Sequence, residues 1–132
     1  LLRETIYCDP AKKSRLEEIL HPRIRALWTE QGRAVSKVGR IFLVDIPLLF
    51  ETRSESFFDQ ILTLACAKAT QMKRLIQGRQ MSEGIAEQII ASQMPWEEKM
   101  VRSHHVVWND GSLQVLNTQA DLFARKLHDR FG

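Results

Sequence analysis

The sequence holds 132 residues, of which 44% are hydrophobic and 27% charged, enough for one compact core but hardly for two. It contains no apolar stretch of ~20 residues and no signal-peptide pattern, so neither a membrane span nor a signal peptide is predicted. Cys8 and Cys66 are too few and too far apart for a metal cluster or a disulfide framework, and they indicate a reducing, cytoplasmic setting. The net charge of +3 is compatible with an anionic ligand, although an ordinary solvated surface is the more common explanation.

The first elements along the chain are predicted helices. Asp9 is suited to cap a helix that has Pro10 in its first turn, and apolar residues recur with helical spacing over residues 11–20. Because Pro22 disfavours helical geometry at His21, we expect a break there and a second helix to about residue 34. The predicted buried face of this second helix consists of Ile24, Leu27 and Trp28.

The stretch 40–51 is predicted to organise the fold. Residues 41–44 form an apolar run that is typical of a strand buried on both faces, and the run ends at the carboxylate of Asp45. In open α/β sheets, ligands bind beyond the carboxyl ends of the strands, where an acid can hold Mg²⁺ directly or through water. The alternative is an aspartate that only caps the following turn, and the residues of this stretch favour neither.

The rest of the chain alternates between predicted strands and helices. The predicted elements are a strand at 61–67, a helix at 69–77, a helix at 83–92 with Ser82 at its start, a short helix at 95–102, a strand at 105–108 and a last helix capped by Ser112. This order implies an α/β fold with parallel pairing and right-handed crossovers. Only three strands are visible and the first residue is Leu1, so we expect a fragment of a longer protein.

Several short sequence motifs, taken in order, resemble the dephospho-CoA kinase family over almost the whole chain. They are Leu2-Arg3 with Asp9-Pro10, Leu16-Glu17 with residues 19–22, residues 45–51, residues 71–75, Gln93 with Pro95 and Lys99, and residues 109–112. The resemblance implies a P-loop kinase fold with a parallel sheet and flanking helices. It also implies transfer of the ATP γ-phosphate to the ribose 3′-hydroxyl of dephospho-CoA, with Mg²⁺, as the last step of coenzyme A synthesis.

The resemblance also implies how the α/β fragment, residues 1–132, is organised. The expected parts are acceptor-side helices at about 9–36, core strands at 40–67, a lid with its following helices at 69–104, and the last strand and helix at 105–132. The Gly-rich Walker A loop of the family, which cradles phosphates, does not occur in the sequence, and neither does the catalytic acid that follows it. We therefore expect the P-loop strand and helix to be missing and the chain to be inactive alone.

Three residues are implied to act on ATP. Arg74 matches an arginine that reaches the transferring phosphate, where a guanidinium stabilises charge. Arg79 lies one position beyond a second arginine of the family, at which this chain has Gly78. Asn109 follows the last strand and would border the adenine. The alternatives are a surface arginine at position 74 and a turn-forming asparagine at 109.

The remaining candidates are one metal ligand and three acceptor-binding residues. Asp45 is the predicted Mg²⁺ ligand, and His21, Gln93 and Lys99 are predicted to bind the acceptor. A structural histidine and a solvated lysine are the competing interpretations of His21 and Lys99. His104 and His105 depart from the family pattern and lack the companions that a metal site needs.

Two rival functions stay open at this point. One is another nucleotide or nucleoside kinase of the same fold, and the other is a basic, non-enzymatic interaction module. Nucleic acid is a weak candidate for a partner, because the lysines and arginines are dispersed and lack the aromatic interleaving of single-strand binders.

Overall fold

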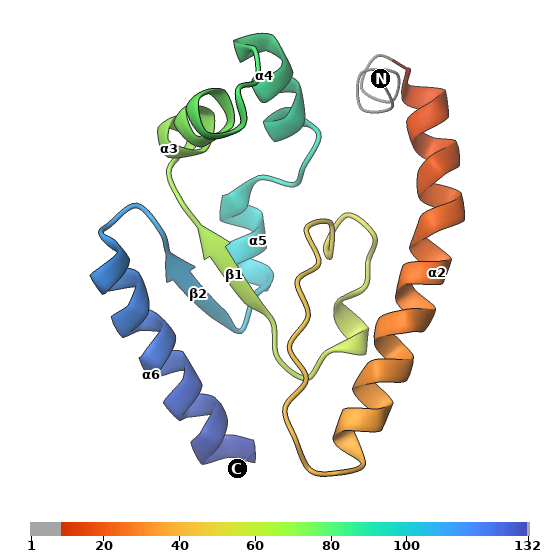
Figure 1. Ribbon diagram of the computed structural model, residues 1–132, viewed down its shortest axis with the longest axis vertical. Coiled ribbons are helices and arrows are strands. Elements are labelled where there is room, and N and C mark those ends of the chain that lie inside the picture. Colours follow the sequence, from red (N-terminus) through yellow and green to blue (C-terminus); the bar gives the residue numbers. More distant parts are fainter. Residues whose placement is uncertain (1–8, 132) are drawn as a thin grey trace. The chain divides into compact units, whose positions relative to one another are not determined.

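The computed structural model describes residues 9–131, which divide into two compact units, one ending at Asp45 and one beginning at Ile46 (Figure 1). Leu2-Arg3 and Cys8, which carry sequence-based expectations, lie outside the described residues. Within residues 9–131, no helix is long and apolar enough to cross a membrane.

The first unit is dominated by α2, Pro10–Ser36, and its predicted start is confirmed. The Asp9 carboxylate accepts hydrogen bonds from the amides of Ala11 at 3.0 Å and Lys12 at 3.2 Å. These bonds satisfy two amides that the first turn leaves without helical partners. The bond from Lys12 is also the main reason why the pKa of Asp9 lies below its ordinary value.

The predicted break at His21-Pro22 is wrong, because Pro22 lies inside one continuous helix (Figure 1). Proline removes a single helical hydrogen bond, and the turns on either side of it keep theirs. The predicted buried face is confirmed only in part. Trp28 is 7% exposed, whereas Ile24 and Leu27 are exposed.

The predicted central strand at 41–44 is also wrong. These residues run without regular secondary structure, and the Leu43 side chain is 77% exposed. A buried parallel strand needs a neighbour with which to share main-chain hydrogen bonds, and the two strands of the described residues pair with each other instead. The segment does pack locally: a Cβ at Gly32 of α2 would lie 3.3 Å from the Phe42 ring, so glycine permits this approach.

The second unit is built on a parallel pair of strands, β1 at Leu62–Ala65 and β2 at His105–Trp108. Leu62 pairs with His105 and Ala65 with Trp108, so both strands run to the same edge of the sheet. The predicted strand at 105–108 and the parallel pairing are confirmed. The strand predicted at 61–67 is observed at Leu62–Ala65, one residue shorter at its start and two at its end.

Helices precede, separate and follow the two strands (Figure 1). They are a short 3₁₀ turn at Glu55–Phe57, α3 at Lys68–Lys73 continued by a π-helical turn at Arg74–Gly78, α4 at Glu83–Ala91, α5 at Trp96–Arg102 and α6 at Leu113–Phe131. The predicted helices are confirmed apart from the π-helical turn. Ser82 holds the N-cap position of α4, but its side chain makes no capping hydrogen bond.

Two of these helices cover opposite faces of the sheet. His105 of β2 packs edge-to-face on Phe123 of α6, with ring centroids 5.0 Å apart. Trp108 packs in the same manner on Trp96 of α5 at 5.1 Å. Because side chains three positions apart on a strand point to opposite faces, α6 and α5 lie on different sides of β2. Ala65 and Val107, one from each strand, are buried between the layers.

One amide side chain of α6 supports the outer edge of β2. The Gln119 Oε1 atom accepts a hydrogen bond from the Trp108 amide, and its Nε2 atom donates to the Trp108 carbonyl, both at 2.9 Å. Gln119 thus occupies the place of a neighbouring strand. Along α6, Leu116, Phe123 and Leu127 are half-buried, whereas Leu113 and Ala120 are exposed.

Candidate functional site

The carboxyl ends of β1 and β2 meet at the turn that follows β2. The Asn109 amide donates to the Ala65 carbonyl at 2.7 Å. The next side chain, Asp110, accepts a hydrogen bond from the Ala67 amide at 2.9 Å. These two bonds join the turn to the end of β1 and to the start of α3, so polar groups that follow both strands lie at one edge of the sheet, where α/β folds place their ligands.

Arg74 reaches this edge from the first residue of the π-helical turn. Its Nη2 atom donates to the Asn109 carbonyl at 2.7 Å and lies 3.4 Å from the Asn109 Oδ1 atom. Two of the predicted site residues, 35 positions apart in sequence, therefore touch. The guanidinium is exposed, and a planar group with five N–H donors can bind Asn109 and still offer donors to an anion.

The electrostatic environment of this edge is mixed. A hydrogen bond from Thr70, followed by the bond from the Ala67 amide, holds the pKa of Asp110 below its ordinary value, and the Arg74 guanidinium acts in the same direction. Burial raises the pKa of the Cys66 thiol, an effect that Arg74 opposes. Asp110 is thus an anion and Cys66 a neutral thiol near neutral pH, and Arg74 supplies the positive charge.

Arg79 lies at the end of the π-helical turn and is exposed. A π-helical turn joins residues i and i+5, so the backbone of Arg79 comes one turn after Arg74 on the same side of the helix. In an α-helix that place would belong to Gly78. The chain ends the helix at once, because Gln80 has a positive φ of 53°. A contact of Arg79 with ATP stays a prediction.

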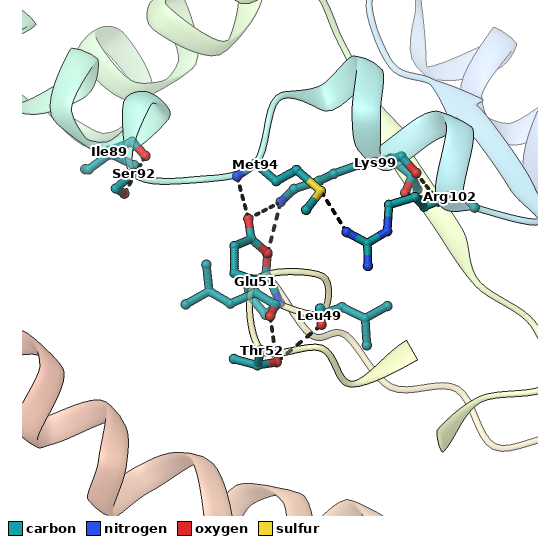
Figure 2. Close-up of polar contacts among 12 residues, drawn as sticks. Leu49, Glu51, Thr52, Ile89, Ser92, Met94, Lys99 and Arg102 are labelled. Carbon is teal, nitrogen blue, oxygen red and sulfur yellow. Dashed lines mark hydrogen bonds and ion pairs between the residues drawn. The ribbon is translucent and has the colours of Figure 1, made fainter. Parts of the chain in front are cut away.

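A second polar cluster joins α5 to the loop that precedes β1 (Figure 2). The Lys99 Nζ atom lies 2.9 Å from the Glu51 Oε1 atom, and the two side chains are only 13% and 20% exposed. The same Glu51 oxygen accepts a hydrogen bond from the Met94 amide at 2.8 Å, and Lys99 also donates to the Pro47 carbonyl at 3.5 Å. The predicted acceptor-binding lysine therefore has an acidic partner already.

Glu51 is an anion in this cluster. Burial raises the pKa of its carboxyl group, but the hydrogen bonds from Lys99 and the Met94 amide outweigh burial, and the net pKa is lowered. Glu51 belongs to the motif at residues 45–51 that resembles the family, but it is not among the site residues predicted from the sequence. Its one signal there is a carboxylate at the end of an apolar run. Gln93, the other predicted acceptor-binding residue of this region, is exposed and precedes Met94.

The remaining candidates, Asp45 and His21, belong to the first unit, where Asp45 is exposed and His21 is half-buried on α2. Within the part of the chain that the structure describes, no three His, Cys, Asp or Glu side chains are grouped as metal ligands. A single accessible carboxylate nevertheless fits Mg²⁺, which keeps several waters and takes its other oxygens from substrate phosphates.

His104 and His105 have structural contacts. The His104 Nδ1 atom accepts a hydrogen bond from the Ile61 amide at 3.0 Å, and the His105 Nε2 atom lies 3.0 Å from the Gln60 Oε1 atom. Both bonds hold the chain at the start of β1 against the start of β2.

Comparison with known proteins decides the family. The family model described as dephospho-CoA kinase matches residues 1–115. The chain therefore belongs to the dephospho-CoA kinase family. Among curated members, the dephospho-CoA kinase of Bacillus cereus is 34% identical over 125 residues, which cover 94% of this chain and 62% of that protein. The dephospho-CoA kinase of Thermosynechococcus vestitus is 39% identical over 120 residues, covering 91% and 58%.

Solved structures agree with this assignment. The dephospho-CoA kinase from Campylobacter jejuni superposes with a TM-score of 0.66 and 26% identity over 96% of this chain and 63% of that one. The crystal structure of TT1252 from Thermus thermophilus gives 0.70 and 28% over 96% and 65%. The predicted α/β fold of P-loop kinase type is confirmed. The chain spans about 60% of the length of the dephospho-CoA kinases that it matches.

Proposed function

We propose that the protein carrying this chain is an ATP-dependent kinase that phosphorylates the ribose 3′-hydroxyl of dephospho-CoA, the last step of coenzyme A synthesis. The family membership over residues 1–115 supports this activity. The observation that carries it is the contact of Arg74 with Asn109 at the carboxyl edge of the parallel strands. That edge is where an α/β kinase binds its nucleotide.

Arg74 is the proposed catalytic residue. Phosphoryl transfer depends on positioning and on neutralising the charge that spreads over the phosphoryl oxygens, and an arginine does both. The bonds to Asn109 orient the guanidinium before ATP arrives, so less freedom is lost on binding. Asn109 borders the adenine, and Arg79 adds a second cation for the phosphates.

Asp45 is the proposed residue for Mg²⁺, held directly or through water. When bound, Mg²⁺ would neutralise negative charge on the ATP phosphates. The role of Asp45 is to supply one carboxylate oxygen. Mg²⁺ prefers such hard ligands, and the side chain is accessible in the described unit.

His21, Gln93 and Lys99 are the proposed contacts of dephospho-CoA. Gln93 is exposed and offers an amide donor for a phosphate or hydroxyl group. Lys99 pairs with Glu51, so a contact with the acceptor requires it to share its ammonium group between the two. Its three N–H donors make this possible.

Transfer also needs a phosphate-binding loop. Residues 1–132 contain no Gly-x-x-x-x-Gly-Lys-Ser/Thr motif, so we propose that this chain alone does not transfer phosphate. Activity is therefore to be measured on the longest natural polypeptide that contains this sequence.

The test compares acceptors and one substitution. With ATP and Mg²⁺, dephospho-CoA should be phosphorylated in preference to AMP and nucleosides, and Arg74→Ala should lower kcat by at least about 10³-fold. Preference for AMP or a nucleoside would identify another kinase of this fold. Steeply salt-dependent binding to nucleic acid without phosphoryl transfer would support the basic, non-enzymatic interaction module instead. A loss of only a few-fold in Arg74→Ala would remove Arg74 from catalysis.

A further inference from the structure

The segment between the two strands that carries Arg74 forms a helical arm, residues 68–93, which contains α3, the π-helical turn and α4. Within the arm, α4 packs against α3 and the π-helical turn, and Ala86 of α4 is completely buried. The arm begins after Ala67, which follows β1, and ends before Met94, which precedes α5, so these two residues are its base.

A carboxylate holds each side of this base. Asp110 accepts the Ala67 amide at 2.9 Å, and Glu51 accepts the Met94 amide at 2.8 Å. A carboxylate that accepts a main-chain N–H forms a charge-assisted hydrogen bond, which is stronger than a neutral one. The backbone is thus fixed where the arm begins and where it ends, which limits the positions that Arg74 can take.

Glu51 has a second partner besides the Met94 amide. Lys99 binds the same Oε1 atom and the Pro47 carbonyl, so one lysine fixes the loop at two points (Figure 2). Three residues further along α5, Arg102 forms an ion pair with Glu55, and its guanidinium lies 5.0 Å from the centroid of the Phe50 ring. One side of α5 therefore fastens the loop 47–55.

The energetics favour a positioning role for this carboxylate over a purely stabilising one. The Glu51 Oε2 atom is buried and has no hydrogen-bond partner among the residues that the structure describes, which costs free energy. Replacing a buried ion pair by apolar groups is often neutral or stabilising. A pair that served stability alone would be better replaced by two hydrophobic residues.

We propose that Glu51, oriented by Lys99, is a positioning residue that fixes Met94 and thereby the arm that carries Arg74. The activity readout rests on the proposed function, whereas the position of Met94 is measured without it. Glu51 touches no reacting group in this scheme and acts through the main chain of the α4–α5 connection.

Two double variants separate the tether from the ion pair. Both Glu51→Gln/Lys99→Met and Glu51→Leu/Lys99→Met lack the buried charges, but only glutamine keeps an oxygen for the Met94 amide. Both variants lose Lys99, a proposed contact of dephospho-CoA, so they are compared with each other and not with the parent. We expect kcat of the leucine variant to lie about 10- to 100-fold below that of the glutamine variant, with little difference in KM between the two. Hydrogen exchange at Met94 should be at least about tenfold faster in the leucine variant.

Controls make the outcome decisive. Glu87→Gln removes an exposed carboxylate of the arm and should change neither readout. If the leucine variant does not fold, Glu51→Asp keeps the charge for Lys99 but shortens the reach to Met94, and it should show slower turnover with faster exchange. Equal kcat and equal Met94 exchange in the two double variants would overturn the proposal. If no variant and no parent phosphorylates dephospho-CoA, the proposed function fails while the exchange result still decides the tether.

Discussion

Two hydroxyl groups that join β1 to α5 provide a sharp test of the fold. The Thr63 Oγ1 atom lies 2.6 Å from the Ser103 Oγ atom, and Ser103 Oγ donates to the Lys99 carbonyl at 2.7 Å. Because the Ser103 hydroxyl has a single proton, Thr63 must be the donor in the first bond. The Thr63 residue is 8% exposed, so its hydroxyl depends on Ser103 for a partner.

Because Thr63 donates to Ser103, loss of the Thr63 hydroxyl and loss of the Ser103 hydroxyl should lower the free energy of unfolding by different amounts. Thr63→Val removes one hydrogen bond and leaves Ser103 bound to the Lys99 carbonyl, so the free energy of unfolding should fall by about 1 kcal/mol. Ser103→Ala removes both bonds and leaves the Thr63 hydroxyl buried without a partner, which should cost about 2 to 3 kcal/mol. The double variant no longer buries an unpaired hydroxyl, so it should be no less stable than Ser103→Ala alone.

Urea unfolding followed by tryptophan fluorescence measures these values, since Trp96 and Trp108 report on the packing of α5 against β2. Thr118→Val is the matched control, because the Thr118 hydroxyl donates to a carbonyl on the exposed side of α6 and its loss should change stability by less than about 0.5 kcal/mol. Strict additivity of Thr63→Val and Ser103→Ala, or a larger cost for Thr63→Val, would refute the reasoning.

Two further predictions concern packing and pH. Ala86 of α4 has no exposed surface, so Ala86→Val should overfill its site and lower the free energy of unfolding by about 1 to 3 kcal/mol. A change below about 0.5 kcal/mol in urea unfolding would show that the site has room. The pKa of Glu51 is lowered on folding from an ordinary value of 4.5, so its contribution to stability is fully present above pH 4.5 and is lost as the pH falls through the lower folded pKa. The difference in unfolding free energy between the parent and Glu51→Gln should therefore be constant from pH 7 to 5 and shrink below pH 4.5. A difference that does not vary with pH would contradict an ionised pair of Glu51 and Lys99.

The elements that could be predicted from the sequence are those whose determinants are local. The strand at 105–108 has a β-branched run followed directly by the turn at Asn109, and α2 begins where Asp9 and Pro10 supply a cap and a first turn. The run at 41–44 has the same local character, but the described structure offers it no pairing partner. Pattern alone identifies a segment that can form a strand and does not supply its neighbour.

The same distinction between local determinants and partners distant in sequence applies to the candidate site. Arg74 and Asn109 could be expected to meet, because parallel strands bring the segments after them to one edge of the sheet. The partners of Glu51 and Asp110 could not, since each carboxylate binds a main-chain amide 43 residues away. Any exposed amide N–H group can donate a hydrogen bond to a carboxylate, so only the folded backbone decides which carboxylate lies within reach of it.

The spacing of the two arginines shows how a local irregularity can carry information that a residue-by-residue comparison misses. Arg74 and Arg79 are five residues apart, and on an α-helix they would diverge by about 140°. The π-helical turn at Arg74–Gly78 reduces this divergence, because its hydrogen bonds join residues five apart and not four. The resemblance to the family implies an arginine at position 78, where this chain has glycine, and replacement of that arginine by Arg79 stays a prediction. The extra residue in the turn allows Arg79 to occupy that side of the helix, and the positive φ of Gln80 ends the helix directly afterwards.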